Sequence, residues 1–297
     1  MRHILVPLDG SVLADRAIPW ADELAGALGA EIRLIRILTP NLLPPLEAEE
    51  SVGQPPHVEE LLARRSLVKS KRRFRRVQPT DTLVRHGPAG ELIAAHAQVD
   101  ADLVVMASHS REGLARALLG SVTATVIGES GIPVLVIPSR VPIQAHVPER
   151  IFVPLDGSPL AEGILDSVIP LALGIHATLF LFGVLPPEHF LGADQWSDLA
   201  GYLETTAQRL RNRGVPIEAE WHVGAVGGSI VEFAHRRQVD LIAMRTHGRR
   251  GLERWISGSV TEHVLAHAEL PVLVDCPAAV GDSGAGTNAP GQRSHAV

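Results

Sequence analysis

Residues 4–11 read ILVPLDGS, and residues 151–158 read IFVPLDGS, so the two stretches differ at a single position. Three later blocks recur in the same order: DLVVM (102–106) returns as DLIAM (240–244), GSVT (120–123) returns at 258–261, and PVLV (133–136) returns at 271–274. An ordered repeat of this kind indicates one folding unit written twice. The offset between copies falls from 147 residues (151 minus 4) to 138 (240 minus 102), which places extra residues in the first copy, near 39–56.

Within each copy, short apolar runs alternate with amphipathic stretches, a pattern typical of a parallel sheet covered by helices on both faces. We therefore predict an α/β fold with five strands per copy. The predicted strands lie near 3–8, 31–38, 80–86, 102–107 and 133–137 in the first copy, and near 150–155, 177–184, 216–222, 240–245 and 271–275 in the second. The predicted helices of the first copy include 14–28, 90–98 and 120–130, the first ending at Gly29 and the last at Gly131.

The length of 297 residues fits two domains of ordinary size. We predict domain 1 at residues 1–140 and domain 2 at residues 149–279, joined by a linker at 141–148 that ends in proline. Residues 280–297 consist largely of Gly, Ala, Ser, Pro and Asn, and we expect them to be disordered.

Composition excludes several classes of protein. The chain carries a net charge of -6 and only 4% aromatic residues, which argues against a nucleic-acid partner. It contains no apolar run of about 18 residues and passes directly into a strand-like stretch rather than a signal peptide, so we expect a cytoplasmic location and no membrane partner. Cys276 is the single cysteine, which fits a reducing compartment and rules out a disulfide framework within one chain.

Enzyme motifs are not evident in the sequence. The two lysines, Lys69 and Lys71, do not follow a glycine loop, so there is no Walker A motif, and neither a G-x-G-x-x-G fingerprint nor a G-x-S-x-G elbow is present. His263 and His267 lie four residues apart and can share a helix face, but no third ligand is evident. We therefore predict no catalytic residue and no metal site.

The candidate ligand site lies where the parallel strands end, because open α/β sheets bind ligands at the carboxyl ends of their strands. The turns Asp9-Gly10-Ser11 and Asp156-Gly157-Ser158 follow the first strand of each copy, and Gly120-Ser121 and Gly258-Ser259 open a later helix. A helix that begins there presents unpaired backbone N–H groups to an anion such as phosphate. The alternative is structural, since Asp-Gly-Ser is also an ordinary turn with a helix cap.

One segment departs from the acidic composition. Residues 64–76 read RRSLVKSKRRFRR and have no counterpart in the second copy. The segment either docks an anionic partner or forms the solvated basic face and end of a helix.

Taken together, V-P-L-D-G-S, an M-x-x-H loop after the fourth strand, G-S-V-T and the closing P-V-L-V resemble the universal stress protein family, in tandem, over residues 1–276. The resemblance implies two flavodoxin-like or Rossmann-like domains of the adenine nucleotide alpha hydrolase-like kind, each with a five-stranded parallel sheet of order 3-2-1-4-5. It also implies pairing of the two domains through their last strands, is compatible with a homo-oligomer, and implies ATP as ligand, with or without Mg²⁺.

ATP-binding members of that family carry a motif that resembles G-x2-G-x9-G-[S/T] after the fourth strand. The second copy has Gly248 and Gly258-Ser259 at this spacing but Arg245 at the first glycine, and the first copy has Ala107 and Ser110 at the two leading positions. By position, the resemblance implies sixteen nucleotide-binding residues: Leu8, Asp9, Ile37, Ala107, Ser110, Gly120, Ser121 and Val122 in the first copy, and Leu155, Asp156, Val184, Arg245, Gly248, Gly258, Ser259 and Val260 in the second.

The predicted function is a cytoplasmic stress-response regulator that binds ATP or another adenine nucleotide at these degenerate motifs. Arg245 either blocks the pocket or donates charge-assisted hydrogen bonds to phosphate. Two alternatives stay open. One is an interaction or dimerisation module with vestigial pockets, and the other is a slow ATP hydrolase that uses His109 or His247.

Overall fold

The structure of the chain is a computed structural model that describes residues 1–39, 56–108, 119–187, 193–246 and 260–277. Its strands confirm the predicted α/β pattern. Domain 1 contributes β1 (His3–Pro7), β2 (Glu31–Leu38), β3 (Asp81–His86), β4 (Leu103–Ser108) and β5 (Val134–Pro138), and domain 2 contributes β6 (Arg150–Pro154), β7 (Thr178–Leu185), β8 (Ile217–Val223), β9 (Leu241–Arg245) and β10 (Val272–Asp275). The central strands are apolar along their length because helices cover both of their faces.

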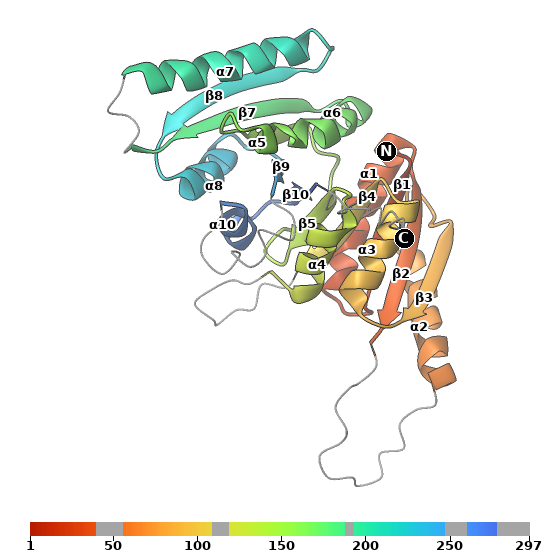
Figure 1. Cartoon of the computed structure of the whole chain (residues 1–297). Helices are drawn as coiled ribbons and strands as arrows, with labels where there is room; N and C mark the ends of the chain where they lie inside the picture. The colour runs from red at the N-terminus through yellow and green to blue at the C-terminus, as the bar shows by residue number, and fades with distance from the viewer. Residues whose placement is uncertain (40–55, 109–118, 188–192, 247–259, 278–297) are drawn as a thin grey trace, which may run out of the picture.

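The strands form one ten-stranded sheet of order β3-β2-β1-β4-β5-β10-β9-β6-β7-β8 (Figure 1). Each domain therefore has the order that the family resemblance implies. Within each domain all neighbours are parallel, and the domains join through an antiparallel pair in which Leu135 of β5 lies opposite Leu273 of β10. Because this pair is antiparallel, the carboxyl ends of the strands lie at one edge of the sheet in domain 1 and at the opposite edge in domain 2.

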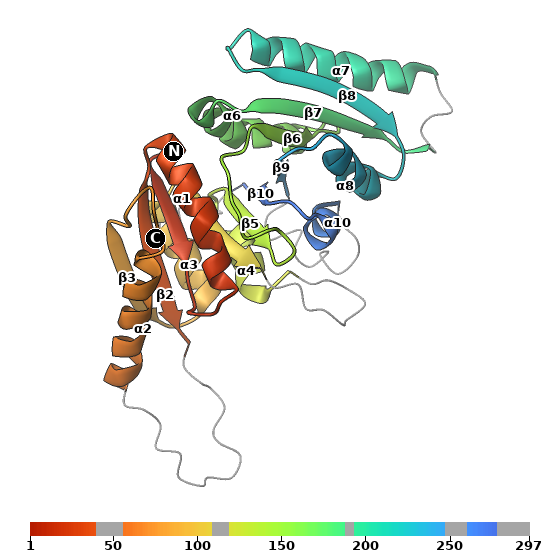
Figure 2. The same ribbon diagram turned by 180° about the vertical axis from the view of Figure 1, so that it is seen from behind.

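The helices form one layer on each face of the sheet (Figure 2). One face carries α1 (Ala17–Leu28), α2 (Pro56–Lys71), α6 (Ile164–Ile175) and α7 (Ala193–Arg211), preceded in each domain by a short turn of helix, η1 (Ala14–Arg16) or α5 (Pro159–Glu162). The other face carries α3 (Ala89–Asp100), α4 (Ser121–Ser130), α8 (Val226–Arg236) and α10 (Val260–His267). None of the helices in the described ranges is long and apolar enough to span a membrane.

The predicted helix stops at Gly29 and Gly131 are confirmed, since both residues adopt left-handed backbone angles, with φ of 64° and 59°. In domain 2 the position of Gly29 is taken by His176, which adopts the same conformation with φ of 60°. Left-handed angles are uncommon for a residue with a side chain, so the same turn is held in domain 2 at some conformational cost.

The segment between the domains packs against both of them. Val141 is buried, and its carbonyl accepts a hydrogen bond from the Arg16 guanidinium of domain 1. On the domain 2 side, Arg140 Nη1 donates to the Ala266 carbonyl at 2.7 Å, and His146 Nε2 lies 2.9 Å from Asp240 Oδ1. The connection is thus tied down by polar contacts to each half.

The basic segment 64–76 is anchored by the acidic residues of domain 1. The buried Asp22 carboxylate of α1 accepts hydrogen bonds from the backbone N–H groups of Arg75, Arg76 and Val77 at 2.7 to 3.1 Å. Arg76 also pairs with Glu23 at 2.9 Å, and Arg73 pairs with Asp15. This arrangement favours the structural interpretation of the segment, in which α1 neutralises part of its charge.

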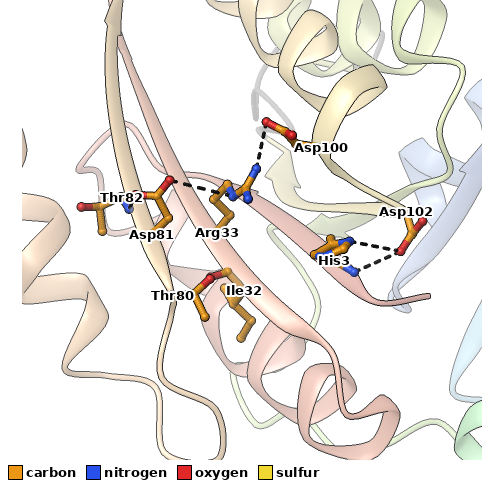
Figure 3. A network of polar contacts seen from close by, with 8 residues as sticks. All are labelled: His3, Ile32, Arg33, Thr80, Asp81, Thr82, Asp100 and Asp102. Carbon is orange, nitrogen blue, oxygen red and sulfur yellow. Dashed lines mark hydrogen bonds and ion pairs between the residues drawn. The ribbon is translucent and has the colours of Figure 1, made fainter.

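A second polar network holds the amino ends of the strands in domain 1 (Figure 3). Asp102 Oδ2, just before β4, accepts from the backbone N–H groups of Arg2 and His3 at 2.5 and 3.0 Å. Arg33 on β2 pairs with Asp100 at 2.8 Å and lies 4.0 Å from Asp81. Burial acts to raise the pKa of Asp102, but the N–H groups of Arg2 and His3 outweigh it, and the pKa lies below its usual 3.8.

Because the folded state lowers the pKa of Asp102, its carboxylate stabilises the fold above pH 3.8 and loses this effect as the pH falls below that value. We expect Asp102→Asn to lower the free energy of unfolding at pH 7 by less than about 1 kcal/mol, since the group is partly solvated. The difference from wild type should shrink as the pH approaches 3. Urea unfolding of the wild-type protein and of Asp102→Asn at pH 7 and at pH 3 measures this difference. A difference that does not change with pH would contradict this role.

Candidate functional site

A pocket of about 840 Å³ lies at the carboxyl ends of the domain 2 strands, a volume suited to a small-molecule ligand. Its walls come from the ends of β6, β7 and β9 and from helices α5, α7, α8 and α10. Five of the predicted nucleotide-binding residues line it together: Leu155, Asp156, Val184, Arg245 and Val260. Residues more than 100 positions apart in the sequence are therefore brought to one cavity.

The Asp156 turn is a structural turn with a helix cap, and it also lies at the candidate ligand site. Asp156 Oδ1 accepts from the Ser158 backbone N–H at 2.9 Å, and Ser158 Oγ caps α5 by accepting from the Ala161 N–H at 3.1 Å. Domain 1 repeats the turn, with Asp9 Oδ1 accepting from the Ser11 N–H at 2.8 Å. Because the hydrogen bonds among the described residues engage only Oδ1, Oδ2 of the exposed Asp156 can accept from a ligand at the pocket wall.

The side of the pocket formed by the sheet is apolar. Phe182 and Met244, from β7 and β9, are buried and lie beside the half-buried Val184. Ile230 of α8 adds to this wall, and Phe182 packs against Phe233 of the same helix with ring centroids 4.4 Å apart. Burial of a flat apolar group against this wall is favourable by the hydrophobic effect.

Arg245 lines the pocket and is held by neighbouring residues. Its guanidinium lies over Gly163, where an added Cβ would come within 1.6 Å of Nη1. Its Nε lies 3.7 Å from Oδ2 of the buried Asp275 on β10, and that carboxylate also accepts from Ser167 Oγ at 3.1 Å. The arginine thus packs against the pocket wall with its charge beside a carboxylate.

Cys276 follows Asp275 in the chain and is also buried. Its burial and, to a smaller extent, the Asp275 carboxylate raise the pKa of its thiol to about 11, so the thiol stays protonated.

Tyr202 on α7 is a pocket residue that the sequence did not reveal. It is the only tyrosine of the chain, and its ring packs 3.9 Å from the Cβ position of Gly157 in the Asp156 turn. Its hydroxyl is buried and has no hydrogen-bond partner among the described residues. Burial and then the neighbouring Glu162 carboxylate raise its pKa, so the hydroxyl remains a hydrogen-bond donor. A lone tyrosine on an amphipathic helix gives no sequence signal of this role.

The predicted residues of domain 1 lie at the equivalent strand ends. Leu8 is buried, Asp9 is exposed, Ile37 lies near the end of β2 and Ala107 lies on β4 beside Ile137 of β5. Gly120 precedes α4 as its cap residue, and Ser121 and Val122 form the first turn of that helix. Here the neighbour of the turn is Arg36 of β2, whose Nη1 lies 2.6 Å from the Cβ position of Gly10.

The remaining predicted positions lie outside the described residues: Ser110, Gly248, Gly258 and Ser259, together with His109 and His247 of the hydrolase alternative. The other histidine pair is described. The rings of His263 and His267 stack with centroids 4.2 Å apart, and burial and then His267 lower the pKa of His263. Across the described ranges, no cluster of three or more His, Cys, Asp or Glu side chains is arranged to hold a metal ion.

The model of the universal stress protein family matches the chain twice, at residues 1–138 and 148–275. The chain belongs to the universal stress protein family. This result confirms the family resemblance of the sequence motifs and the tandem arrangement.

Relatives of this universal stress protein include chains that match nearly all of it and chains that match less than half of it. A universal stress protein of Mycobacterium tuberculosis is 27% identical over 290 residues, which cover 91% of this chain and 96% of the relative. One from Methanocaldococcus jannaschii is 32% identical over 137 residues, 42% of this chain and 81% of the relative. The crystal structure of a universal stress protein from Archaeoglobus fulgidus superposes with a TM-score of 0.73 at 17% identity, covering 93% of this chain and 98% of that one, and it shows the shared fold.

Proposed function

We propose that this universal stress protein binds an adenine nucleotide in the pocket of domain 2 and acts as a stress-response regulator rather than as a turnover enzyme. The observation that supports the proposal is the convergence of Leu155, Asp156, Val184, Arg245 and Val260 on one cavity of about 840 Å³. These residues were selected by family motif position alone, and the fold brings them together at a site typical of ligand binding in α/β sheets.

The chemistry of the pocket fits the nucleoside part of such a ligand. The apolar wall around Phe182 and Val184 suits a flat base, and the available Oδ2 of Asp156 suits a ribose hydroxyl as donor. The family motif assigns the phosphates to Gly258 and Ser259, directly before α10 begins at Val260. Asp275 lies beside Arg245 and partly neutralises the charge of its guanidinium. This weakens the attraction of Arg245 for a phosphate group.

The test is a calorimetric titration with ATP and with adenosine, using a variant pair that the repeat provides. Asp156→Asn keeps an acceptor for the Ser158 N–H but removes the charge, and we expect it to weaken binding about tenfold by loss of a charge-assisted hydrogen bond. Asp9→Asn makes the same change in domain 1 and should leave this affinity unaltered. Absence of binding by the wild-type protein up to millimolar ATP would exclude the proposed function.

The interaction module with a vestigial pocket is the second candidate function, and the packing of Arg245 on Gly163 favours it. A side chain at a position that is glycine in the ATP-binding motif narrows the space open to a ligand. The same titration separates the two candidates, because a vestigial pocket gives no heat of binding with either ligand. A cytoplasmic location, the domain limits 1–140 and 149–279, and a homo-oligomer stay predictions from the sequence.

A further inference from the structure

Two leucine side chains of helix α7 pack closely against Gly183 of β7. A Cβ added to Gly183 would lie 2.9 Å from Leu203 Cδ1 and 3.0 Å from Leu199 Cδ1, both on α7. These distances are shorter than a normal carbon–carbon contact, which is about 3.5 to 4.0 Å. The missing side chain of Gly183 is therefore what permits α7 to approach β7 this closely.

This close approach brings Tyr202 to the pocket. Tyr202 lies between Leu199 and Leu203 on the helix, and its ring reaches the Asp156-Gly157 turn, where it forms a wall of the cavity. The same cavity is lined by the apolar surface around Val184 and Phe182, whose side chains lie on the other face of β7 from α7. A cavity lined by both an aromatic ring and an apolar surface suits a flat aromatic ligand, because aromatic rings stack favourably.

Domain 1 is built differently at the matching position. In β2, Ile35 lies opposite Pro7 of β1, and in β7, Phe182 lies opposite Pro154 of β6. The next residues along these two strands, Arg36 and Gly183, therefore occupy equivalent positions. The Arg36 guanidinium, not a ring from the helix, lies beside the Asp9-Gly10 turn. On α2 the counterpart of Tyr202 is Leu62, which is 49% exposed. The helices align at this offset because their buried positions match: Ala63, Leu67 and Ser70 with Leu203, Ala207 and Leu210.

We infer that Tyr202 determines the specificity of the domain 2 pocket by stacking its ring on the base of a purine nucleoside or nucleotide. Domain 1 lacks this contact. The inference rests on the proposed function and adds the residue that selects the ligand. It locates the contact at the nucleoside, because Tyr202 adjoins the Asp156 turn rather than the start of α10. The effect of Tyr202 on affinity should therefore be independent of the phosphates.

The wild-type protein itself allows a direct test. Since the chain contains one tyrosine, ¹³C-labelled tyrosine gives a single ring spin system in an NMR spectrum. Adenosine and ATP should each shift this signal by ring current, with a saturation curve that follows the calorimetric affinity. Binding in calorimetry with an unchanged tyrosine signal would overturn the inference alone. Absence of binding in calorimetry would overturn the proposed function and the inference with it.

Two variants measure the size of the contact. Tyr202→Leu, which introduces the residue of domain 1, should weaken the binding of adenosine and of ATP by the same factor of about tenfold, because base–aromatic stacking is lost. Tyr202→Phe keeps the ring, so its affinity for both ligands should stay within about twofold of the wild-type affinity. A loss confined to ATP, or an equal loss in both variants, would show that Tyr202 does not act by stacking on the base.

Discussion

Replacement of Asp22 by alanine is expected to lower the free energy of unfolding by about 3 kcal/mol, because a buried carboxylate that accepts several hydrogen bonds is lost at once. Its two oxygens accept from the backbone N–H groups of Arg75, Arg76 and Val77, all within 3.1 Å. Without the carboxylate, these partly buried N–H donors lose their acceptor. The loss should appear in urea unfolding followed by circular dichroism.

The neighbouring Glu23 provides the control for this prediction. Its carboxylate pairs with Arg76 Nε at 2.9 Å, but the arginine is 56% exposed, so Glu23→Ala should cost less than about 1 kcal/mol. Asp22→Asn keeps one acceptor oxygen, so its loss in free energy of unfolding should lie between those of Asp22→Ala and Glu23→Ala. Equal losses for Asp22→Ala and Glu23→Ala would show that the segment after α2 is held by charge attraction rather than by its backbone hydrogen bonds.

Gly183→Val is expected to weaken nucleotide binding more than Tyr202→Leu or Asp156→Asn does, and to lower stability by about 2 kcal/mol through overpacking. The valine methyl groups must occupy space that Leu199 and Leu203 already fill, so α7 has to move away from β7. Tyr202 moves with the helix, and the pocket loses one wall. Affinity for adenosine should fall by more than in Tyr202→Leu, as measured by the same calorimetric titration.

The matched control is Arg36→Val, which places the same side chain at the same strand position of domain 1. A long side chain is already accommodated there, so valine introduces no clash with α2. Stability should change by less than about 1 kcal/mol and nucleotide affinity should stay unaltered. If Gly183→Val bound adenosine as tightly as Arg36→Val, the close approach of α7 would have no part in forming the pocket.

Much of the fold could be predicted from the sequence, because the apolar runs of the strands are short, separated by helix-length stretches and repeated. The strand ends at Asp9 and Asp156 could also be predicted, since the Asp-Gly-Ser turn is a local signal that each copy carries. What these signals share is that the residues involved lie close together in the sequence.

The rest depends on contacts between distant residues. Asp22 occupies the position of the buried Ile169 in the second copy, so the repeat itself suggests an apolar residue there and conceals a hydrogen-bonded anchor. Arg245 had two opposite interpretations in sequence, and only the positions of Gly163 and Asp275 reveal how it packs. The role of Tyr202 likewise depends on Gly183, which lies on another element and looks in sequence like a weak point of a strand.

Residues 139–149 connect the two domains covalently and form hydrogen bonds with Arg16 of domain 1 and Asp240 of domain 2. This connection affects how the sequence of the protein can evolve. In a symmetric dimer of separate identical chains, every substitution occurs twice, so the two ligand sites must stay alike. Here a single gene encodes both partners of the pair in one polypeptide. Each half can therefore acquire its own substitutions, and Gly183 in one half with Arg36 in the other is a combination that identical subunits could never hold.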